Sequence, residues 1–476
     1  MIENRLAAVV LAAGAGSRFG GGKLLAPLDG RPILAHVLEA LPSVDLVDTV
    51  VVVGHGAAEI EQGIAWAGER RVLNPDPDAG LASSLKVGFA ALEAATGGSL
   101  DGVFVVLGDQ PLVDRAVFRA LAAAVVGAGT EFVVPRYLGG GGANPVLVLR
   151  SGFDRIAEAH GDRGLGPLLA AEPGRVAEVE LGGSNPDVDT PADLAELAWA
   201  DRVRRDRIQV DRIREVPDGP DFYRPLTGLF RADPRRTDEP LLDALLGLAR
   251  PDDTWLDVGA GAGRYALPVA LRVREVIAVE PSAGMRAALA ELATENAIAN
   301  VRTLDARWPP TPGSPAAGLH VDVALIAHIG YDIEAIGPFL DALEEATDRI
   351  CLAVLMDRQP SSAADRFWPP IHGEERVRLP ALEAFVDLLR ARGADPAIER
   401  FERPARGFAS FDELHAFVRR QLWVADDGPR DRQLATLLRA AAEPSDGGWT
   451  LPDGRHEIGL VRWVPRSGGV RPDGGR

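Results

Sequence analysis

Cysteine is almost absent from this chain, which has one cysteine, Cys351, among 476 residues. A lone cysteine has no partner within the chain, so the sequence excludes an intramolecular disulfide. Cys351 lies in the apolar run ICLAVLM, where we expect a buried structural thiol rather than a reactive one. A chain without disulfides suits a reducing compartment, and we therefore expect a cytoplasmic protein.

Long apolar runs and an excess of positive charge are also missing. No run approaches the roughly 20 apolar residues that a membrane-spanning helix needs, so we expect no membrane partner. The chain has 69 acidic and 51 basic residues and a net charge of −18, which disfavours nonspecific binding to nucleic acid. An acidic protein that binds polyphosphates must therefore do so locally, with loops and metal ions.

The sequence is rich in alternating strand-like and helix-like segments, which indicates parallel α/β sheets. Its length of 476 residues predicts two or three domains, and its hydrophobic content of 46% is enough to fill their cores. In the first half we expect strands at Ala7–Ala12, Thr49–Gly54, Val103–Leu107 and Phe132–Pro135. Helices are expected at Ile33–Leu41, Ser83–Ala94, Asp114–Val126 and Pro191–Arg205.

The texture changes at residues 201–222, which are dense in charge and indicate the tail of a helix followed by a linker. The alternation then restarts, with strands expected at Thr254–Val258, Val276–Val279, Val301–Leu304, Val323–Ala327 and Ile350–Leu355. The two halves show no obvious repeat. We therefore predict two different Rossmann-like, three-layer α/β/α domains, at residues 1–200 and 223–466. The Gly-, Pro- and Arg-rich residues 467–476 are expected to be disordered.

The most informative segment is VVLAAGAGSRFGGGKLL, residues 9–25. An apolar strand ends in a glycine-rich loop that carries Arg18 and Lys23, which predicts a phosphate cradle. The loop is not a P-loop, because Leu24 follows Lys23 where a Ser or Thr would hold Mg²⁺. It is not a dinucleotide fingerprint either, because Phe19 stands where the third glycine should be. Its metal ligands must come from elsewhere.

Two acidic segments can supply those ligands. Asp109 ends the strand-like segment VFVVLGDQPL, and a carboxylate there faces the same crevice as the glycine loop. Asp187 and Asp189 precede a helix with Thr190 as its natural N-cap. The structural alternatives are a turn or N-cap role for Asp109 and helix-dipole complementation by the other two aspartates. Either Asp187 or Asp189 would complete the metal site.

The motifs LAAGxGxRFGxxK, GDQP and DVDTPADL together resemble the nucleotidyltransferases of the molybdenum-cofactor type, over roughly residues 5–200. The version Leu11-Ala12-Ala13-Gly14 is similar to the cytidylyltransferases, whereas the guanylyltransferase relatives have a second glycine in place of Ala13. The segment NPDPDAGLASSL also resembles that subfamily. There, the resemblance places three residues near the nucleotide, namely Gly80, Ser83 and Ser84.

The resemblance implies a Mg²⁺-dependent transfer of CMP from CTP to molybdopterin, with Arg18, Lys23 and Asp109 in catalysis and a molybdenum hydroxylase as a partner that receives the product. Two departures lie where the acceptor is expected. The family's Gly-His-Pro is replaced by Ala143-Asn144-Pro145, and Gly166 stands in place of an arginine. Acceptor identity is therefore open, and the alternatives are a sugar phosphate, phospholactate or a GTP-dependent reaction.

A second glycine-rich segment, TWLDVGAGAGR, follows a strand that carries Asp257. The spacing of Gly259, Gly261 and Gly263 resembles the class I S-adenosylmethionine-dependent methyltransferases, over roughly residues 220–465. This resemblance implies that Glu280 binds the ribose hydroxyls and that Asp305 contacts the adenine amine. The structural alternatives are a strand-end turn for Asp257 and a solvent-facing loop acid for Asp305.

The methyl acceptor is left unknown by the sequence. His328 and Tyr331 follow the fourth strand, where the family places acceptor groups, so we expect His328 as a general base and Tyr331 in the pocket wall. A structural histidine is the alternative. The aromatic regions Phe367–Pro370 and Phe408–Trp423 form either a lid or ordinary core, and core is favoured. A second alternative makes this half a regulatory module that binds the cofactor without catalysis.

Overall fold

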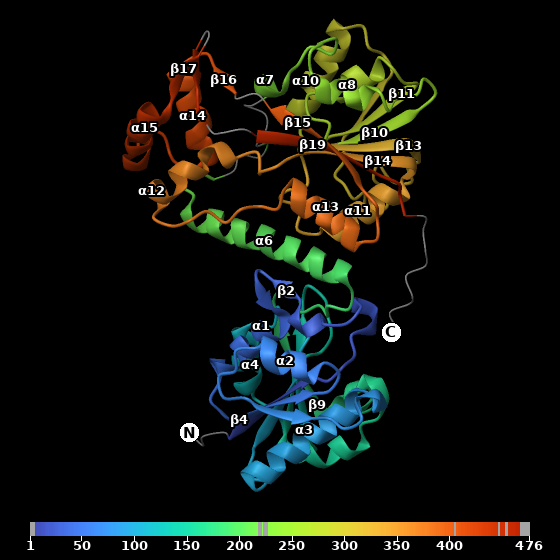
Figure 1. Cartoon of the computed structure of the whole chain (residues 1–476), viewed down its shortest axis with the longest axis vertical. Coiled ribbons are helices and arrows are strands. Elements are labelled where there is room, and N and C mark those ends of the chain that lie inside the picture. Colours follow the sequence, from blue (N-terminus) through green and yellow to red (C-terminus); the bar gives the residue numbers. More distant parts are fainter. Residues whose placement is uncertain are drawn as a thin grey trace. The chain divides into compact units, whose positions relative to one another are not determined.

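A computed structural model describes residues 5–217, 221, 227–403, 406–445, 448–452 and 456–466. It divides into two compact units, Met1–Leu194 and Ala195–Arg476 (Figure 1). The expected disordered tail at 467–476 lies outside the described residues, as does part of the expected linker. Within the described residues, no helix is long and apolar enough to cross a membrane.

The first unit is built on a seven-stranded mixed sheet of order β5-β4-β1-β6-β8-β7-β9. Its strands are β1 Leu6–Ala12, β4 Leu46–Val53, β5 Arg70–Leu73, β6 Gly102–Leu107, β7 Phe132–Tyr137, β8 Val146–Leu149 and β9 Val176–Leu181. A short hairpin joins β2 Pro27–Leu28 and β3 Arg31–Pro32. Its helices are α1 Ile33–Ala40, α2 Ala57–Gly63, α3 Leu81–Thr96, α4 Arg115–Ala122 and α5 Gly166–Ala171.

The central strand β1 is buried on both faces. Ala8 and Val10 pack in one hydrophobic cluster with α1 and α4, whereas Ala7 and Val9 pack in another with α3. A parallel strand covered on both faces reads as a continuous apolar run, which explains why this strand is visible in the sequence. The first unit is therefore a three-layer α/β domain, as predicted.

The helix predicted at Asp114–Val126 is shorter than expected. Asp114 is the N-cap, and its carboxylate accepts a 2.6 Å hydrogen bond from the Ala116 N–H. The helix ends at Ala122, and Val125 beyond it is fully exposed. Helix propensity alone cannot extend a helix that has no core to bury against.

The second unit contains another seven-stranded sheet, of order β12-β11-β10-β13-β14-β19-β15. Its strands are β10 Thr254–Val258, β11 Glu275–Val279, β12 Val301–Leu304, β13 Val321–Ala327, β14 Thr347–Met356, β15 Ala397–Arg403 and β19 His456–Trp463. Strands β10–β14 are mutually parallel and β19 is antiparallel to both neighbours. The chain order reverses between β10 and β13, which makes the crevice at their carboxyl ends the expected ligand site.

Helices cover both faces of this second sheet. They are α7 Thr227–Phe230, α8 Pro240–Leu246, α9 Ala266–Ala270, α10 Ala283–Glu295, α11 Ile336–Glu345 and α13 Leu382–Ala391. The inner residues divide between two clusters, one with α11 and α13 and the other with α8 to α10. This unit is also a three-layer α/β domain, and the five strands predicted for it are all present.

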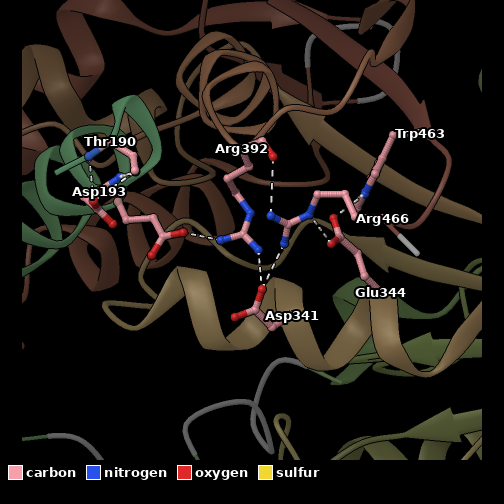
Figure 2. Close-up of polar contacts among 8 residues, drawn as sticks. Thr190, Asp193, Asp341, Glu344, Arg392, Trp463 and Arg466 are labelled. Carbon is pink, nitrogen blue, oxygen red and sulfur yellow. Dashed lines mark hydrogen bonds and ion pairs between the residues drawn. The ribbon is translucent and has the colours of Figure 1, made fainter. Parts of the chain in front are cut away.

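Helix α6, Pro191–Ile213, extends into the charged stretch that we expected to be the tail of a helix followed by a linker, and it ends eight residues later than the predicted Arg205. From Ala195 onward it packs on the second unit, where the Trp199 indole donates to the Ile333 carbonyl at 3.0 Å. Figure 2 shows the buried Arg392 guanidinium paired with Asp341 of α11 and with a glutamate, Glu196 of α6. Within the charged stretch, Arg204 and Arg207 pair with Glu334, and Arg212 pairs with Glu374, so these charges have a structural role.

A helical subdomain extends from the carboxyl edge of the second sheet. It consists of α12 Trp368–His372, α14 Phe411–Gln421, α15 Pro429–Ala441, β16 Gly407–Phe408, β17 Glu443–Ser445 and β18 Gly448–Thr450 (Figure 1). Its aromatic residues Phe367, Trp368, Phe408 and Phe411 are buried in a hydrophobic cluster of its own. The aromatic regions are therefore core, which is the alternative that we favoured.

Candidate functional sites

Two loops meet at the carboxyl edge of the first sheet. Strands β1 and β6 are adjacent and parallel, with Leu11 opposite Leu107. The Gly108 N–H donates to the Leu11 carbonyl at 3.0 Å, so the GDQP segment starts beside the glycine-rich loop. Three consecutive glycines, Gly20 to Gly22, have φ between 65° and 94°. This left-handed run, which favours glycine, turns the chain back and returns Lys23 to the sheet edge.

The predicted catalytic residues of the first unit are brought together there. Lys23 Nζ lies 2.6 Å from Asp109 Oδ2 and 3.4 Å from Asp189 Oδ1. Arg18 Nη1 lies 2.9 Å from Asp189 Oδ2. The Lys23 side chain is only 13% exposed, whereas that of Arg18 is 72% exposed. The ammonium group is therefore held in place, and the guanidinium extends into solvent.

Asp187 is held differently from the other two aspartates. Its Oδ1 accepts a 2.7 Å hydrogen bond from the Gln110 amide. Partial desolvation, reinforced by the negative charge of Asp109, raises the pKa of Asp187. Among the described residues, the oxygens of Asp109, Asp187 and Asp189 do not all lie within 4.8 Å of one another, and Lys23 contacts two of the three aspartates.

Sequence reasoning missed two amides that organise this site. Gln110 and Asn185 are each 1% exposed. The Asn185 amide donates to the Gln110 Oε1 at 3.0 Å and to the Asn144 carbonyl at 3.3 Å. This chain of hydrogen bonds links Asp187 to Asn144, one of the departures from the family pattern. Both amides lie beside predicted metal ligands in the sequence, since Gln110 directly follows Asp109 and Asn185 lies two residues before Asp187.

The predicted nucleotide-contacting residues lie in two segments of the first unit, at the carboxyl end of β1 and at the start of α3. Leu11, Ala12 and Ala13 are buried, whereas Gly14 is exposed and has open space where a side chain would start. Gly80 has a φ of 92°, and a Cβ on it would lie 2.5 Å from Asp162 Oδ1. The loop before α3 is thus packed closely against the loop that contains Asp162, and only glycine fits.

The two serines of this segment have different environments. Ser84 is 4% exposed and its Oγ accepts a 3.0 Å hydrogen bond from the Asn74 amide. Ser83 is half-buried and donates to Asn74 Oδ1 and to the Asp76 carbonyl. Asn74 therefore shapes the loop through both side chains, and Ser83 is the better exposed of the two.

A cavity of about 140 Å³ lies beside the first loop. Its walls come from β1 and β6, from the start of α3, and from the segments around Asn144 and Arg163. Most lining residues are aliphatic, with Asn144 and Arg163 as the polar ones. Both departures from the family pattern, Asn144 and Gly166, line this cavity.

In the second unit, the glycine-rich loop is fixed by the neighbouring strand. The Gly259 N–H donates to the Val279 carbonyl at 2.8 Å. Glu280 accepts hydrogen bonds from the N–H groups of Gly261, at 2.9 Å, and Ser282, at 2.8 Å. Gly263 has a φ of 85°, and a Cβ on it would lie 2.9 Å from Leu267. Glycine is therefore required at position 263, where the loop turns and a side chain would collide with Leu267.

Asp257 is the most perturbed acid of this second site. It is 3% exposed, and its Oδ1 has no hydrogen-bond partner among the described residues. Burial, reinforced by the charge of Glu280, raises the pKa of Asp257 to about 8. A buried carboxylate of this kind is stabilised by a cationic or hydrogen-bond-donating ligand. S-adenosylmethionine carries an ammonium group and a sulfonium group, so the site fits this cofactor.

The remaining predicted residues of the second unit are less enclosed or are already engaged. The Asp305 side chain is 70% exposed and lies 2.7 Å from Arg286 Nη2, which matches the solvent-facing alternative. Tyr331 is buried, and its hydroxyl accepts a 2.7 Å hydrogen bond from the Met356 N–H. This hydrogen bond gives Tyr331 a structural role, and its place in the wall of a pocket stays a prediction. His328 Nε2 lies 3.2 Å from Tyr265 Oη.

These features define a nucleotidyltransferase-like first unit and a second unit with the strand order of a doubly wound cofactor-binding sheet. Residues 8–176 match the family model of the MobA-like NTP transferase domain. The homologue of Mycobacterium tuberculosis Rv0371c from Mycobacterium sp. strain JC1 is 32% identical over 41% of this chain and 95% of that chain, with a TM-score of 0.35. The N-terminal unit belongs to the MobA-like NTP transferase family.

Two further proteins are similar to parts of this chain, one to its first unit and one to its second. The bifunctional protein GlmU of Leifsonia xyli is 34% identical over 164 residues, which are 34% of this chain and 30% of that protein. The chain thus spans less than a third of the length of such curated relatives. Geranyl diphosphate C-methyltransferase of Streptomyces coelicolor A3(2) is 14% identical over 48% of this chain and 78% of that chain, with a TM-score of 0.29.

Proposed function

We propose that the first unit transfers CMP from CTP to the phosphate of molybdopterin, with Mg²⁺ bound by Asp109 and by Asp187 or Asp189. The observation that carries this proposal is the pairing of Lys23 with Asp109 and Asp189 beside the glycine-rich loop. Bound Mg²⁺ would neutralise charge on the transferring phosphates. The same carboxylates would then release Lys23 to bind phosphate oxygens.

The proposed reaction needs no proton transfer to or from a side chain of the protein. A terminal phosphate oxygen of the acceptor forms a bond to the α-phosphorus, the bond from that phosphorus to the bridging oxygen breaks, and pyrophosphate leaves. The attacking oxygen is already an anion, so no general base is needed. The barrier is the crowding of negative charge, which Lys23 and Arg18 relieve together with the N–H groups of the loop.

The choice of CTP rests on the loop Leu11 to Gly14, in which Ala13 leaves less room than a second glycine would. Gly80, Ser83 and Ser84 complete the proposed nucleotide site. The acceptor would approach from the side of Asn144 and Arg163. A second candidate keeps the reaction and changes the acceptor to a sugar phosphate or phospholactate, or the nucleotide to GTP. The relatives named GlmU favour retaining this candidate.

The test is nucleotide and acceptor selectivity of the full chain. Each of the four NTPs is incubated with Mg²⁺ and molybdopterin, a sugar 1-phosphate or phospholactate, and pyrophosphate release is measured. We expect release only with CTP and molybdopterin. A preference for GTP or UTP, or for a sugar phosphate, would replace the first candidate with the second. If CTP and molybdopterin are the substrates, we expect the product to reach a molybdenum hydroxylase in the cytoplasm.

We propose further that the second unit binds S-adenosylmethionine and methylates a small acceptor. Asp257 and Glu280, with the loop Gly259 to Gly263, would hold the cofactor, and Asp305 would lie near its adenine. Bound S-adenosylmethionine supplies the electrophilic methyl group. The buried Asp257 oxygen that lacks a hydrogen-bond partner among the described residues carries this proposal.

The alternative for the second unit is a regulatory module that binds the cofactor without transfer. Calorimetric titration of the full chain with S-adenosylhomocysteine tests binding, and incubation of a small-molecule extract with methyl-labelled cofactor tests transfer. We expect saturable binding and one labelled product. Binding without a labelled product would support the regulatory alternative, and no binding would overturn both.

A further inference from the structure

Two contacts tie the second glycine-rich loop to the segment that follows β13. Tyr265 directly follows the loop, and its hydroxyl lies 3.2 Å from His328 Nε2. At the other end of the loop, a Cβ on Gly259 would lie 2.9 Å from Ile329 Cδ1. Residues 328–329 therefore support both ends of the loop that would hold the cofactor.

The backbone of His328 is specialised for this contact. Its φ is 58°, in the left-handed region that non-glycine residues rarely adopt. The His328 N–H donates to the Val354 carbonyl at 2.8 Å, which fixes the segment to β14. A strained backbone conformation is retained only where surrounding contacts stabilise it. At His328, this conformation directs the imidazole towards the Tyr265 hydroxyl.

Tyr265 is itself firmly held. It is 3% exposed, and burial raises the pKa of its phenol, so the hydroxyl keeps its proton. The guanidinium carbons of Arg264 and Arg236 lie 5.7 Å and 6.0 Å from its ring centroid. Glu239 pairs with both arginines, at 2.9 Å from Arg264 and 2.5 Å from Arg236. The phenol is thus a fixed hydrogen-bonding group at the end of the loop.

This arrangement does not suit His328 to the role of general base. A neutral imidazole has one nitrogen that accepts a proton. If that nitrogen is Nε2, Tyr265 already donates to it, and if it is Nδ1, the nitrogen is buried. An incoming acceptor would have to break the Tyr265 contact before its proton could be removed at Nε2.

We infer that His328 is a positioning residue that acts through Tyr265 to hold the glycine-rich loop in its cofactor-binding shape. This inference rests on the proposed binding of S-adenosylmethionine, and it replaces the general base that the sequence led us to expect. His328 and Tyr265 contribute as one unit, because each supplies half of a single contact.

The test is calorimetric titration of full-length variants with S-adenosylhomocysteine. Tyr265→Phe and His328→Gly each remove the contact, and the glycine also accepts the left-handed backbone. We expect each to weaken binding by about 3- to 10-fold, the range of one hydrogen bond, and the double variant to be no weaker than either single one. His328→Gln restores a hydrogen-bonding group and should recover most of the affinity. Exposed His320 provides the control His320→Gln, which should bind as the wild type does.

The outcomes separate this inference from the proposed function. If the wild type does not bind S-adenosylhomocysteine, the proposed function of the second unit fails. If the wild type binds and Tyr265→Phe and His328→Gly bind equally well, the positioning role fails. Additive losses in the double variant would also overturn it, because the two residues would then act separately. Melting temperatures of all variants identify any that are misfolded.

Discussion

The two glycine-rich loops follow parallel strands of similar sheets, but the acidic side chains beside them differ in whether a cation neutralises them. In the first unit, Lys23 and Arg18 neutralise Asp109 and Asp189, so the site already contains its own cations. In the second unit, Asp257 is buried next to Glu280, and its pKa is raised to about 8. The first arrangement suits a polyanion that arrives with a metal ion, whereas the second suits a ligand that brings its own positive charge.

The largest expected effect comes from removing a cation or a metal ligand in the first unit. Lys23→Ala or Asp109→Asn should lower the rate of CMP transfer by about 10²- to 10³-fold, because each removes electrostatic stabilisation of the transferring phosphate. The measurement is pyrophosphate release by the full chain. Lys86→Ala, at an exposed lysine on α3, is the matched control and should keep the wild-type rate. Near-wild-type rates of CMP transfer by both Lys23→Ala and Asp109→Asn would contradict the proposed catalytic roles of these residues.

The next effect tests the uncompensated acid of the second unit. Asp257→Asn should weaken binding of S-adenosylhomocysteine by about 10- to 100-fold, because a charge-assisted hydrogen bond to the ligand's ammonium group is lost. The same variant should be more stable without ligand at pH 8, because it no longer buries a carboxylate that must ionise. Titration calorimetry and thermal melting measure the two effects on one preparation.

The sign of this stability effect follows from the raised pKa of Asp257. The folded protein holds the proton up to about pH 8, whereas the unfolded chain releases it near the ordinary value of 3.8. Below pH 3.8, Asp257 is protonated in both the folded and the unfolded protein and does not lower the free energy of unfolding. As the pH rises from 3.8 towards 8, the unfolded chain can ionise this group and the folded protein cannot, so the free energy of unfolding falls. Asp257→Asn lacks that decline. Parallel pH profiles for the wild type and the variant would contradict the raised pKa.

The sequence revealed the edge strand β12 and most of the central strands, but it missed β5, β9 and β15 at the sheet edges and also the interior strands β8 and β19. β1 is buried along its whole length and reads as an apolar run, and β10 is equally buried although it contains Asp257. The edge strand β5 has alternating half-buried and exposed residues that include Arg70 and Arg71, and β9 alternates similarly. Partly exposed strands carry charge, so their apolar signal is too weak to detect.

The candidate sites were predictable where motifs are local and unpredictable where contacts are distant in sequence. The sequence singled out Lys23 and Asp109 because each lies in a short motif, and the structure places their side chains 2.6 Å apart. The Tyr265–His328 contact joins residues 63 apart, and the Asn185–Gln110 contact joins residues 75 apart. Such pairs depend on which strands become neighbours, and a single sequence does not record that choice.

A smaller effect is expected at Gln110, which orients Asp187 from behind. Gln110→Leu keeps the size of the side chain but removes the 2.7 Å hydrogen bond to Asp187. We expect the Mg²⁺ concentration for half-maximal CMP transfer to rise by about 10-fold, with a nearly normal rate at saturating Mg²⁺. Gln62→Leu, at an exposed position of α2, is the control. An unchanged Mg²⁺ requirement would show that Asp187 does not contribute to the metal site and would leave Asp189 in that role.

The smallest effect is expected at Asp305, which contrasts with Glu280 in the same proposed cofactor site of the second unit. Glu280 is 6% exposed and accepts two backbone hydrogen bonds, whereas the Asp305 side chain is 70% exposed and pairs with Arg286. Asp305→Ala should therefore change the affinity for S-adenosylhomocysteine by less than about 3-fold, because an exposed charge contributes little. Glu280→Gln serves as the comparison and should weaken binding much more, since its hydrogen bonds shape the loop. If Asp305→Ala were the more damaging change, the bound cofactor would have to draw Asp305 away from Arg286 and out of solvent.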